Sequence, residues 1–221
     1  MSGYRRLRYS QAAYRGSEAC TYTACYLAYA CLADPRLVDA DLLSEASAEV
    51  LDEYVRRGCE AWLQLKLPSA QPALNVLRQD PFLQSKLQLQ EDQVSARQDL
   101  RDASGELVLE STEAILWKWI NSSSPSCCIV TTWDGYSFLV VPPVGSSAVA
   151  YAVIDTHSDT IERRGHALSR LSIPVQQTGQ GGLIWSTLFP SEVVHFVLEY
   201  CQTSSPEAQT DLSILALRAQ L

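Results

Sequence analysis

Apolar residues follow a different pattern in each half of the chain, and the first half has the pattern of helices. After Ser17, the stretch EACTYTACYLAYACLADP carries Ala, Leu, Tyr and Cys on nearly every face of a helix. A helix that is apolar all round is a buried one. We therefore expect a core helix that Ser17 caps and that ends before Pro35.

Two further helices are predicted in the first half. Residues 39–65 form an amphipathic pattern, because their apolar positions recur at helical spacing. These positions are Leu43, Ala46, Val50, Tyr54 and Val55. The stretch STEAILWKWI has Ser111 as a cap and Glu113 in its first turn, which predicts a short helix.

The second half has the pattern of strands. Two apolar runs, CCIVTTW and YSFLVVPP, are joined by the hairpin signal Asp134-Gly135, and AVAYAVIDTH and GGLIWSTLF predict two more strands. The stretch SEVVHFVLEYC predicts a helix capped by Ser191, and residues 206–221 predict a last helix. Helices followed by strands indicate an α+β fold with a largely antiparallel sheet.

The chain has the length and composition of one globular domain. Its 221 residues are 47% hydrophobic and 19% charged, and no repeat or linker divides them. Residues 79–106 are rich in Gln, Asp, Ser and Arg without sustained periodicity, which is typical of a surface insertion or loop. We therefore expect a single domain over residues 1–221 with an insertion at about 79–106.

Charge and hydropathy argue against several kinds of partner. The net charge is −8, yet the first sixteen residues contain Arg5, Arg6, Arg8 and Arg15 and no acidic residue. An acidic body argues against nucleic acid and favours a basic protein partner, although a surface charged only for solubility explains the same balance. No apolar run is long enough to span a membrane, and Tyr, Thr and Glu18 make the stretch after the arginines too polar for a signal peptide. We therefore expect a cytoplasmic protein that binds neither nucleic acid nor membrane.

Cysteine usage fits a reducing compartment. Seven cysteines, an odd number, occur without the regular spacing of a disulfide framework. No C-x-x-C motif is present and the three histidines are scattered. We therefore expect no structural zinc, no other metal site and no cofactor.

Asp155 and His157 end the apolar run AYAVIDTH, one residue apart. Alternate side chains of a strand share a face, so the carboxylate and the imidazole are expected within reach of each other. A carboxylate that accepts a hydrogen bond from one ring nitrogen orients the imidazole and raises its basicity. Such a base would serve a nucleophile; the alternative is a solvated strand end with Asp as a turn former.

Cys20 is the cysteine best placed to be that nucleophile. If Ser17 caps the helix, Cys20 lies in the first turn, where the helix dipole lowers the pKa of a thiol. The other six cysteines are expected to be small buried hydrophobic residues. Gln11, nine residues before Cys20, can offer a side-chain amide to a developing oxyanion.

A glutamine, a cysteine at a helix start and a much later Asp-x-His follow one another as in papain-like cysteine proteases. The stretches QAAYRGSEACTYTACYLAYACL and YAVIDTHSD resemble the herpesvirus tegument deubiquitinases and their relatives outside herpesviruses. The likeness extends to the WDGYSFLVV hairpin, the Gly-rich approach to LIWSTLF and the helix after it, and is weak over residues 36–125. It implies a papain-like fold and hydrolysis of isopeptide bonds after the C-terminal Gly of ubiquitin.

The resemblance also implies a role for each of four residues. Cys20 corresponds to the nucleophile, His157 to the general base, and Asp155 to the acid that orients this base. Gln11 corresponds to the glutamine of the oxyanion hole. Asp159 is a rival for Asp155, because it also lies two residues from His157, but it falls in a polar segment beyond the predicted strand.

Other aromatic residues and histidines have weaker assignments. Trp133, Trp185 or the segment 79–106 could line a channel for the ubiquitin tail, with core packing as the alternative for both tryptophans. His195 fits the apolar pattern of its helix and is expected to be packed. His166 stands close to two arginines and is expected to be exposed.

The protein expected from these residues is a monomeric cysteine-type deubiquitinase whose partner is ubiquitin or polyubiquitin. Its compartment is the cytoplasm, or the host cytosol if the chain comes from a virus or an intracellular bacterium. The triad specifies acyl transfer through a thiol but not the acyl group. Two alternatives therefore stay open: a peptidase or acyltransferase for another substrate, and an inert interaction domain with the same fold.

Overall fold

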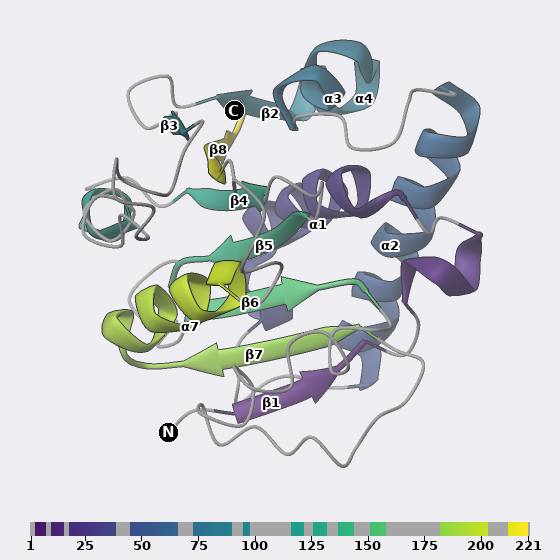
Figure 1. Cartoon of the computed structure of the whole chain (residues 1–221). Helices are drawn as coiled ribbons and strands as arrows, with labels where there is room; N and C mark the ends of the chain where they lie inside the picture. Colours follow the sequence, from purple (N-terminus) through teal and green to yellow (C-terminus); the bar gives the residue numbers. More distant parts are fainter. Residues whose placement is uncertain are drawn as a thin grey trace.

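Eight strands form one sheet at the centre of the computed structural model, with helices on both faces of the sheet (Figure 1). The structure describes residues 3–7, 10–15, 18–38, 45–65, 73–89, 95–97, 116–121, 126–131, 137–143, 151–157, 182–202 and 212–220. The neighbouring strands pair antiparallel throughout these residues. The predicted combination of helices with an antiparallel sheet is confirmed.

The order of the strands in the sheet is β1-β7-β6-β5-β4-β8-β2, with β3 beside β8. Their bounds are β1 Gly3–Arg6, β2 Leu87–Leu89, β3 Ser95–Arg97, β4 Cys127–Thr131, β5 Ser137–Val141, β6 Tyr151–Asp155, β7 Leu183–Thr187 and β8 Leu212–Ala219. The four strands predicted from apolar runs, β4 to β7, are thus neighbours at the centre of the sheet.

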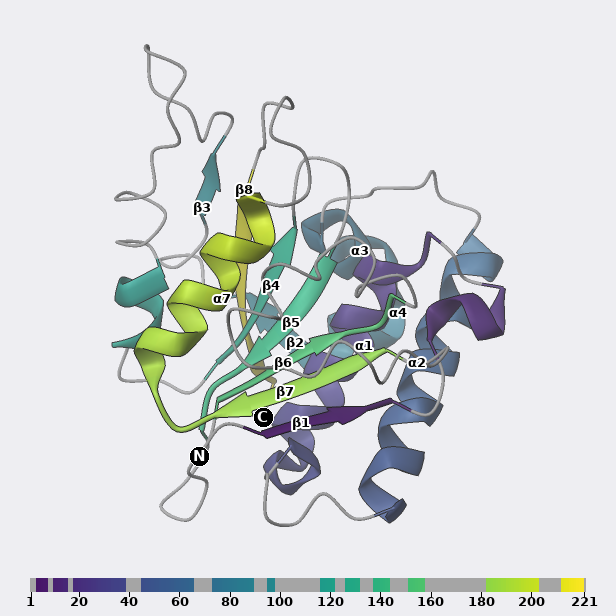
Figure 2. The same cartoon turned by 60° about the horizontal axis from the view of Figure 1, so that its bottom comes forward.

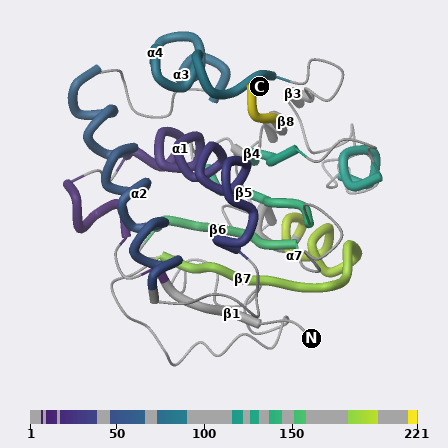
Figure 3. The backbone as a smooth tube through the Cα atoms, turned by 180° about the vertical axis from the view of Figure 1, so that it is seen from behind, coloured from purple at the N-terminus to yellow at the C-terminus, as the bar shows by residue number. Residues whose placement is uncertain are grey.

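Helices cover the two faces unequally. Their bounds are η1 Gln11–Tyr14, α1 Cys20–Ala33, η2 Pro35–Val38, α2 Glu45–Leu65, α3 Ala73–Gln79, α4 Pro81–Lys86 and α7 Pro190–Gln202, and residues 116–120 are also helical. From behind, α1 and α2 lie in front of the sheet (Figure 3). The view in Figure 2 shows α7 on the opposite side of the sheet.

Each central strand supplies side chains to two separate cores. In β5, Leu139 and Val141 pack in the core under α1, whereas Phe138 and Val140 pack in the core under α7. All five residues of β5 are buried. A strand that is covered on both faces reads as a continuous apolar run, which is why the sequence predicted these strands clearly.

The first long helix is buried as predicted, but it begins later. Its first residue is Cys20 and its N-cap is Ala19, so the prediction of Ser17 as the cap is wrong. Ser17 itself lies outside the described residues. The helix ends at Ala33, before Pro35, as expected. Cys20 therefore occupies the first helical position, closer to the positive end of the helix dipole than predicted.

The second helix, α2, buries part of the face that the apolar spacing predicted, since Val55 is buried and Tyr54 packs against the core. Its buried positions include Leu51, Val55 and Cys59, which are spaced four residues apart along the helix. Ala46 and Val50, expected on the apolar face, are exposed. The predicted start at residues 39–44 lies outside the described residues.

Two less regular parts of the chain contain regular elements, and the helix predicted for the second of them is wrong. Within the expected insertion at 79–106, α4, β2 and β3 are regular elements, and Leu83 and Leu87 are buried. The tail at 206–221, predicted as a helix, contains β8, which pairs with β4, β2 and β3. The sheet thus takes up segments whose local sequence has no strand pattern.

Three smaller differences concern the ends of elements. The strand β1, which was not predicted, pairs with β7. The helix α7 begins at Pro190, so Ser191 lies inside its first turn and is not its cap. Of the short helix expected from Ser111, the structure describes residues 116–120.

Among the described residues, no helix combines the length and apolar character that crossing a membrane requires.

Candidate active site

Asp155 and His157 stand at the end of β6, where the strand leaves the sheet. Asp155 is fully buried and pairs with Leu183 of β7. Its Oδ1 accepts a hydrogen bond from His157 Nδ1 at 2.6 Å and another from the main-chain N–H of His157 at 3.0 Å. With Nδ1 held by the carboxylate, Nε2 is the ring nitrogen left for chemistry.

The structure brings Cys20 to this ring. Cys20 is the first residue of α1, is 4% exposed and makes a side-chain hydrogen bond with His157. The start of α1, the start of β5 and the end of β6 meet at one end of the sheet, at the right in Figure 1. A thiol, an imidazole and a carboxylate from distant parts of the chain therefore form one connected row.

The pKa values of this row favour a charged pair. Burial by itself raises the pKa of Cys20, but the hydrogen bond and charge of His157, together with hydrogen bonds from Ser137 and Thr21, bring the pKa below its ordinary value of 9.0. Burial likewise opposes the His157 cation, yet the charge and hydrogen bond of Asp155, with those of Cys20, raise the pKa of His157 to about 10. The two shifts together favour the thiolate of Cys20 and the imidazolium of His157 over the neutral pair.

The other buried cysteines differ from Cys20 in this respect. Burial without a neighbouring cation raises the pKa of each of them well above the ordinary thiol value. They are Cys25, Cys31, Cys59, Cys127 and Cys128. As predicted, these five behave as small buried hydrophobic residues, and none of them forms a disulfide.

Two polar residues that sequence reasoning missed also contact the sulfur. The main-chain N–H of Ser137, at the start of β5, and the hydroxyl of Thr21 both form hydrogen bonds that stabilise the Cys20 thiolate. Their own hydroxyls are 2.8 Å apart. A serine and a threonine carry no local sequence signal for such a role, because the contact joins two elements that are distant in the chain.

Gln11 is anchored beside this row by its main chain and its side chain. Its main-chain N–H donates to the carbonyl of Thr156 at 2.9 Å, and its carbonyl accepts from Cys59 Sγ at 3.7 Å. The side-chain Oε1 lies 2.9 Å from the hydroxyl of Thr156, the residue between Asp155 and His157. The structure thus places Gln11, which is 2% exposed, at the same end of the sheet as Cys20 and His157.

A glycine allows the close approach that holds the end of β6. A Cβ atom on Gly182 would lie 2.4 Å from the carbonyl oxygen of Asp155 and 2.9 Å from Thr156 Cα. The carbonyl of Gly182 also accepts a hydrogen bond from the main-chain N–H of Leu7 at 3.0 Å. A glycine directly before a buried strand was the available sequence signal for this contact.

Trp185 has the core packing that was the alternative to a channel, whereas His195 differs from its prediction. Trp185 is 1% exposed and stacks on Phe196 at 5.1 Å in the core under α7, so it does not line a channel. His195 is exposed on α7, and the prediction that it is packed is wrong. Trp133, Asp159 and His166 lie outside the described residues.

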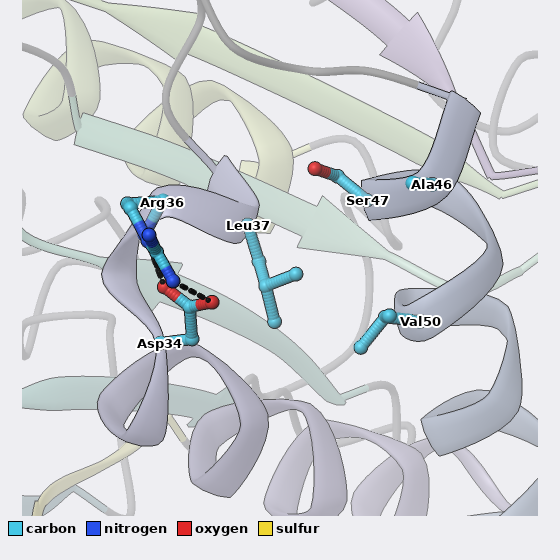
Figure 4. A pocket seen from close by; sticks show the side chains of 6 residues that line it. All are labelled: Asp34, Arg36, Leu37, Ala46, Ser47 and Val50. Carbon is cyan, nitrogen blue, oxygen red and sulfur yellow. Dashed lines mark hydrogen bonds and ion pairs between the residues drawn. The ribbon is translucent and has the colours of Figure 1, made fainter.

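The described surface also has a hollow away from this row (Figure 4). It holds about 320 Å³ between the end of α1 and the first turns of α2. Its lining residues are Asp34, Arg36, Leu37, Ala46, Ser47 and Val50. Because α1 rises about 1.5 Å per residue, its length separates this hollow from Cys20 by roughly 20 Å. The hollow is therefore distinct from the candidate site.

The described residues contain no cluster of three or more His, Cys, Asp or Glu side chains that could hold a metal ion. In general, a thiol beside an imidazole that a carboxylate orients can act as a nucleophile with a proton carrier.

Comparison with protein-family models gives no match, and neither does comparison with curated proteins. Among solved structures, the fold is similar to that of the ubiquitin-specific protease encoded by the murine cytomegalovirus tegument protein M48, determined in complex with a ubiquitin-based suicide substrate. The TM-score is 0.57 at 13% sequence identity, over 99% of this chain and 86% of that one. The similarity shows that the two chains share a fold.

Proposed function

We propose that this chain is a cysteine-type deubiquitinase that hydrolyses isopeptide bonds after the C-terminal Gly of ubiquitin. One observation carries the proposal: Cys20 is hydrogen-bonded to a His157 ring that Asp155 holds by Nδ1. Its support is the likeness of the fold to a viral ubiquitin-specific protease. The proposed catalytic residues are Cys20, His157 and Asp155, in the manner of papain-like enzymes.

The proposed reaction passes through a thioester. The Cys20 thiolate attacks the carbonyl carbon of the terminal Gly, and an S–C bond forms as the carbonyl oxygen becomes an oxyanion. The C–N bond to the lysine amine then breaks while His157 Nε2 gives its proton to the departing nitrogen. A water molecule next loses a proton to Nε2 as its oxygen attacks the thioester, and the breaking C–S bond returns the thiolate.

Gln11 is the proposed side-chain donor to the oxyanion. An amide carries two N–H groups, and donors fixed before the reaction stabilise negative charge without reorganisation. The main-chain N–H of Cys20, at the start of α1, is the proposed second donor. The anchoring of Gln11 through Thr156 supports this role, because it joins Gln11 to the segment that carries His157.

Burial of the site favours an acyl group without side chains. Cys20 is 4% exposed and His157 is 8% exposed, so a substrate must reach the sulfur through a narrow approach. Ubiquitin ends in two glycines on a flexible tail, which suits such an approach. We further expect a monomer that acts in the cytoplasm, or in a host cytosol, where ubiquitin conjugates occur.

Labelling with a ubiquitin whose C-terminus carries an electrophile tests the nucleophile and the substrate together. We expect one adduct on the wild type, none on Cys20→Ala, and an unchanged adduct on Cys25→Ala. Cys25 is a matched control, since it lies in the same helix but burial raises the pKa of its thiol. An adduct on Cys20→Ala would overturn the assignment of the nucleophile.

A panel of diubiquitins then tests hydrolysis. We expect cleavage by the wild type and by Cys25→Ala, and no cleavage by Cys20→Ala. Wild-type protein that reacts with iodoacetamide at Cys20 but cleaves no ubiquitin substrate would contradict the deubiquitinase assignment. That result would favour a peptidase or acyltransferase with another substrate. A Cys20 that reacts no faster than free cysteine would favour an inert interaction domain instead.

A further inference from the structure

A buried row of three polar contacts leads from the start of α1 to Gln11. The Thr23 hydroxyl lies 2.9 Å from the Cys20 carbonyl oxygen and 3.0 Å from the Thr156 hydroxyl. The Thr156 hydroxyl in turn lies 2.9 Å from Gln11 Oε1. All of these side chains are at most 4% exposed, so their hydrogen bonds are made within the protein.

Counting hydrogen atoms restricts how this row can be bonded. Each hydroxyl donates only one hydrogen, so the two threonines cannot supply all three contacts. In the first arrangement, Thr156 donates to Gln11 Oε1, and Thr23 donates either to Thr156 or to the Cys20 carbonyl. In the second, Thr23 donates to the Cys20 carbonyl, Thr156 donates to Thr23, and the amide of Gln11 turns over to donate to Thr156.

The acceptors favour the first arrangement. The Cys20 carbonyl is the first of α1 and accepts the main-chain N–H four residues later in the helix, so it does not need the Thr23 hydrogen. The Thr156 hydroxyl donates to the amide oxygen of Gln11 at 2.9 Å. The first arrangement keeps this contact between the Thr156 hydroxyl and Gln11 Oε1, whereas the second replaces it by an amide N–H.

We infer that Thr156 and Thr23 are positioning residues that hold the Gln11 amide with its oxygen on Thr156 and its N–H groups turned away from Thr156. The inference rests on the proposed role of Gln11 as an oxyanion donor. In the opposite orientation the amide would offer its oxygen, which repels a developing negative charge. The two threonines therefore determine whether Gln11 assists acyl transfer or opposes it.

Replacing Thr156 by Val tests this directly, because Val keeps the shape and removes the hydroxyl. We expect kcat for a ubiquitin C-terminal aminocoumarin amide to fall about 10-fold with KM nearly unchanged, against about 100- to 1000-fold for Gln11→Ala. Thr156→Ser, which keeps the hydroxyl, should restore most of kcat. In the double variant Gln11→Ala/Thr156→Val, the second change should cost no further activity.

Two controls separate positioning from damage to the fold. The rate of Cys20 alkylation as a function of pH should stay the same in Thr156→Val, since the thiolate depends on His157 and not on Gln11. Thr187→Val removes an equally buried hydroxyl at the far end of β7 and should leave turnover unchanged. If Thr156→Val does not fold, Thr23→Val serves in its place, with a smaller loss of kcat that also vanishes without Gln11.

Hydrolysis of p-nitrophenyl acetate, measured beside the ubiquitin amide, distinguishes the two proposals. If the wild type hydrolyses the ester but not the ubiquitin amide, the ubiquitin assignment fails. The role of Thr156 is then tested by kcat for the ester in the same variants. Any one of three results would overturn the inference. They are a further loss of kcat in the double variant beyond that of Gln11→Ala, a wild-type kcat in Thr156→Val, and failure of Thr156→Ser to restore kcat. A wild type that hydrolyses neither substrate would overturn both proposals.

Discussion

Replacing Asp155 by Asn tests whether the His157 cation depends on its buried carboxylate. Burial opposes this cation, and the charge and hydrogen bond of Asp155, together with Cys20, raise the pKa of His157 from 6.5 to about 10. At about 1.36 kcal/mol per pH unit, this difference corresponds to about 5 kcal/mol in favour of the charged ring. That figure is a net value: burial lowers the pKa of His157, and Asp155 and Cys20 together more than offset it, so the figure is not the share of Asp155 alone.

The hydrogen bond between Asp155 and His157 gives a second free energy for the loss of the carboxylate. A bond to a charged partner contributes about 1.5–3 kcal/mol, so its loss makes the imidazolium roughly 10- to 150-fold less favourable. Asparagine can also donate its N–H to Nδ1 of His157. The ring proton then stays on Nε2, and this wrong tautomer cannot act as a base, which costs up to about 10⁴ in kcat. We therefore expect kcat to fall by about 10² to 10⁴ in Asp155→Asn.

The assay is the rate of Cys20 alkylation by iodoacetamide across about pH 5 to pH 9, measured beside turnover. The wild type should react as a thiolate below the ordinary thiol pKa, whereas Asp155→Asn should react slowly at pH 6 and faster as pH rises. Asp80→Asn is a matched control: Asp80 is another buried carboxylate, which caps α4 and accepts from the hydroxyl of Tyr26. Asp80→Asn should lower Tm and leave the pH profile of Cys20 alkylation unchanged. An unchanged profile in Asp155→Asn would refute the reasoning.

Three further predictions follow from the packing around the site. Gly182→Ala places a Cβ where Asp155 O is 2.4 Å away, so the end of β6 must move; we expect turnover to fall at least about 10-fold and Tm to fall, as kinetics and thermal melts would show. A chain that ends before Leu212 lacks the strand between β4 and β2, and its circular dichroism melt should lose its cooperative transition. The raised pKa of His157 contributes stability that is complete below about pH 6.5 and is lost as pH rises toward 10. Because the lowered pKa of Cys20 contributes in the opposite direction, the test uses a Cys20→Ala background: urea unfolding between these values should show a steeper loss of stability with His157 than with His157→Asn, and equal slopes would contradict the linkage.

The parts of the fold that the sequence predicted are those whose burial is uniform. The strands β4 to β7 are covered on both faces and α1 is buried nearly all round, so their apolar runs are continuous. The strand β8 was predicted as a helix because Ala, Leu and Arg favour helices locally, yet pairing with three strands overrides that preference. The strand β1, with the sequence GYRR, has no apolar pattern at all and depends on its pairing with β7.

The candidate site could be predicted only as far as its chemistry has a sequence pattern. Asp-x-His at a strand end and a cysteine at a helix start have such a pattern, and the structure brings Asp155, His157 and Cys20 together. The contact of Ser137 with the sulfur has no pattern, because it forms only when β5 meets the start of α1. The same holds for the hydrogen bond between Thr156 and Gln11, which no local spacing predicts.

The helix α2 supplies none of the proposed catalytic residues, but one of its turns contacts both ends of the row of polar contacts that leads to Gln11. A Cβ on Gly58 would lie 2.7 Å from Thr23 Cα, so glycine lets α2 approach α1 at the residue that begins the row to Gln11. The next residue, Cys59, donates its S–H to the carbonyl of Gln11, at the other end of that row. Neighbouring residues of α2 thus fix both ends of the group that orients the proposed oxyanion donor. Because this turn contacts the main chains of both Thr23 and Gln11, we expect a side chain introduced at Gly58 to lower turnover in the proposed reaction without touching a substrate.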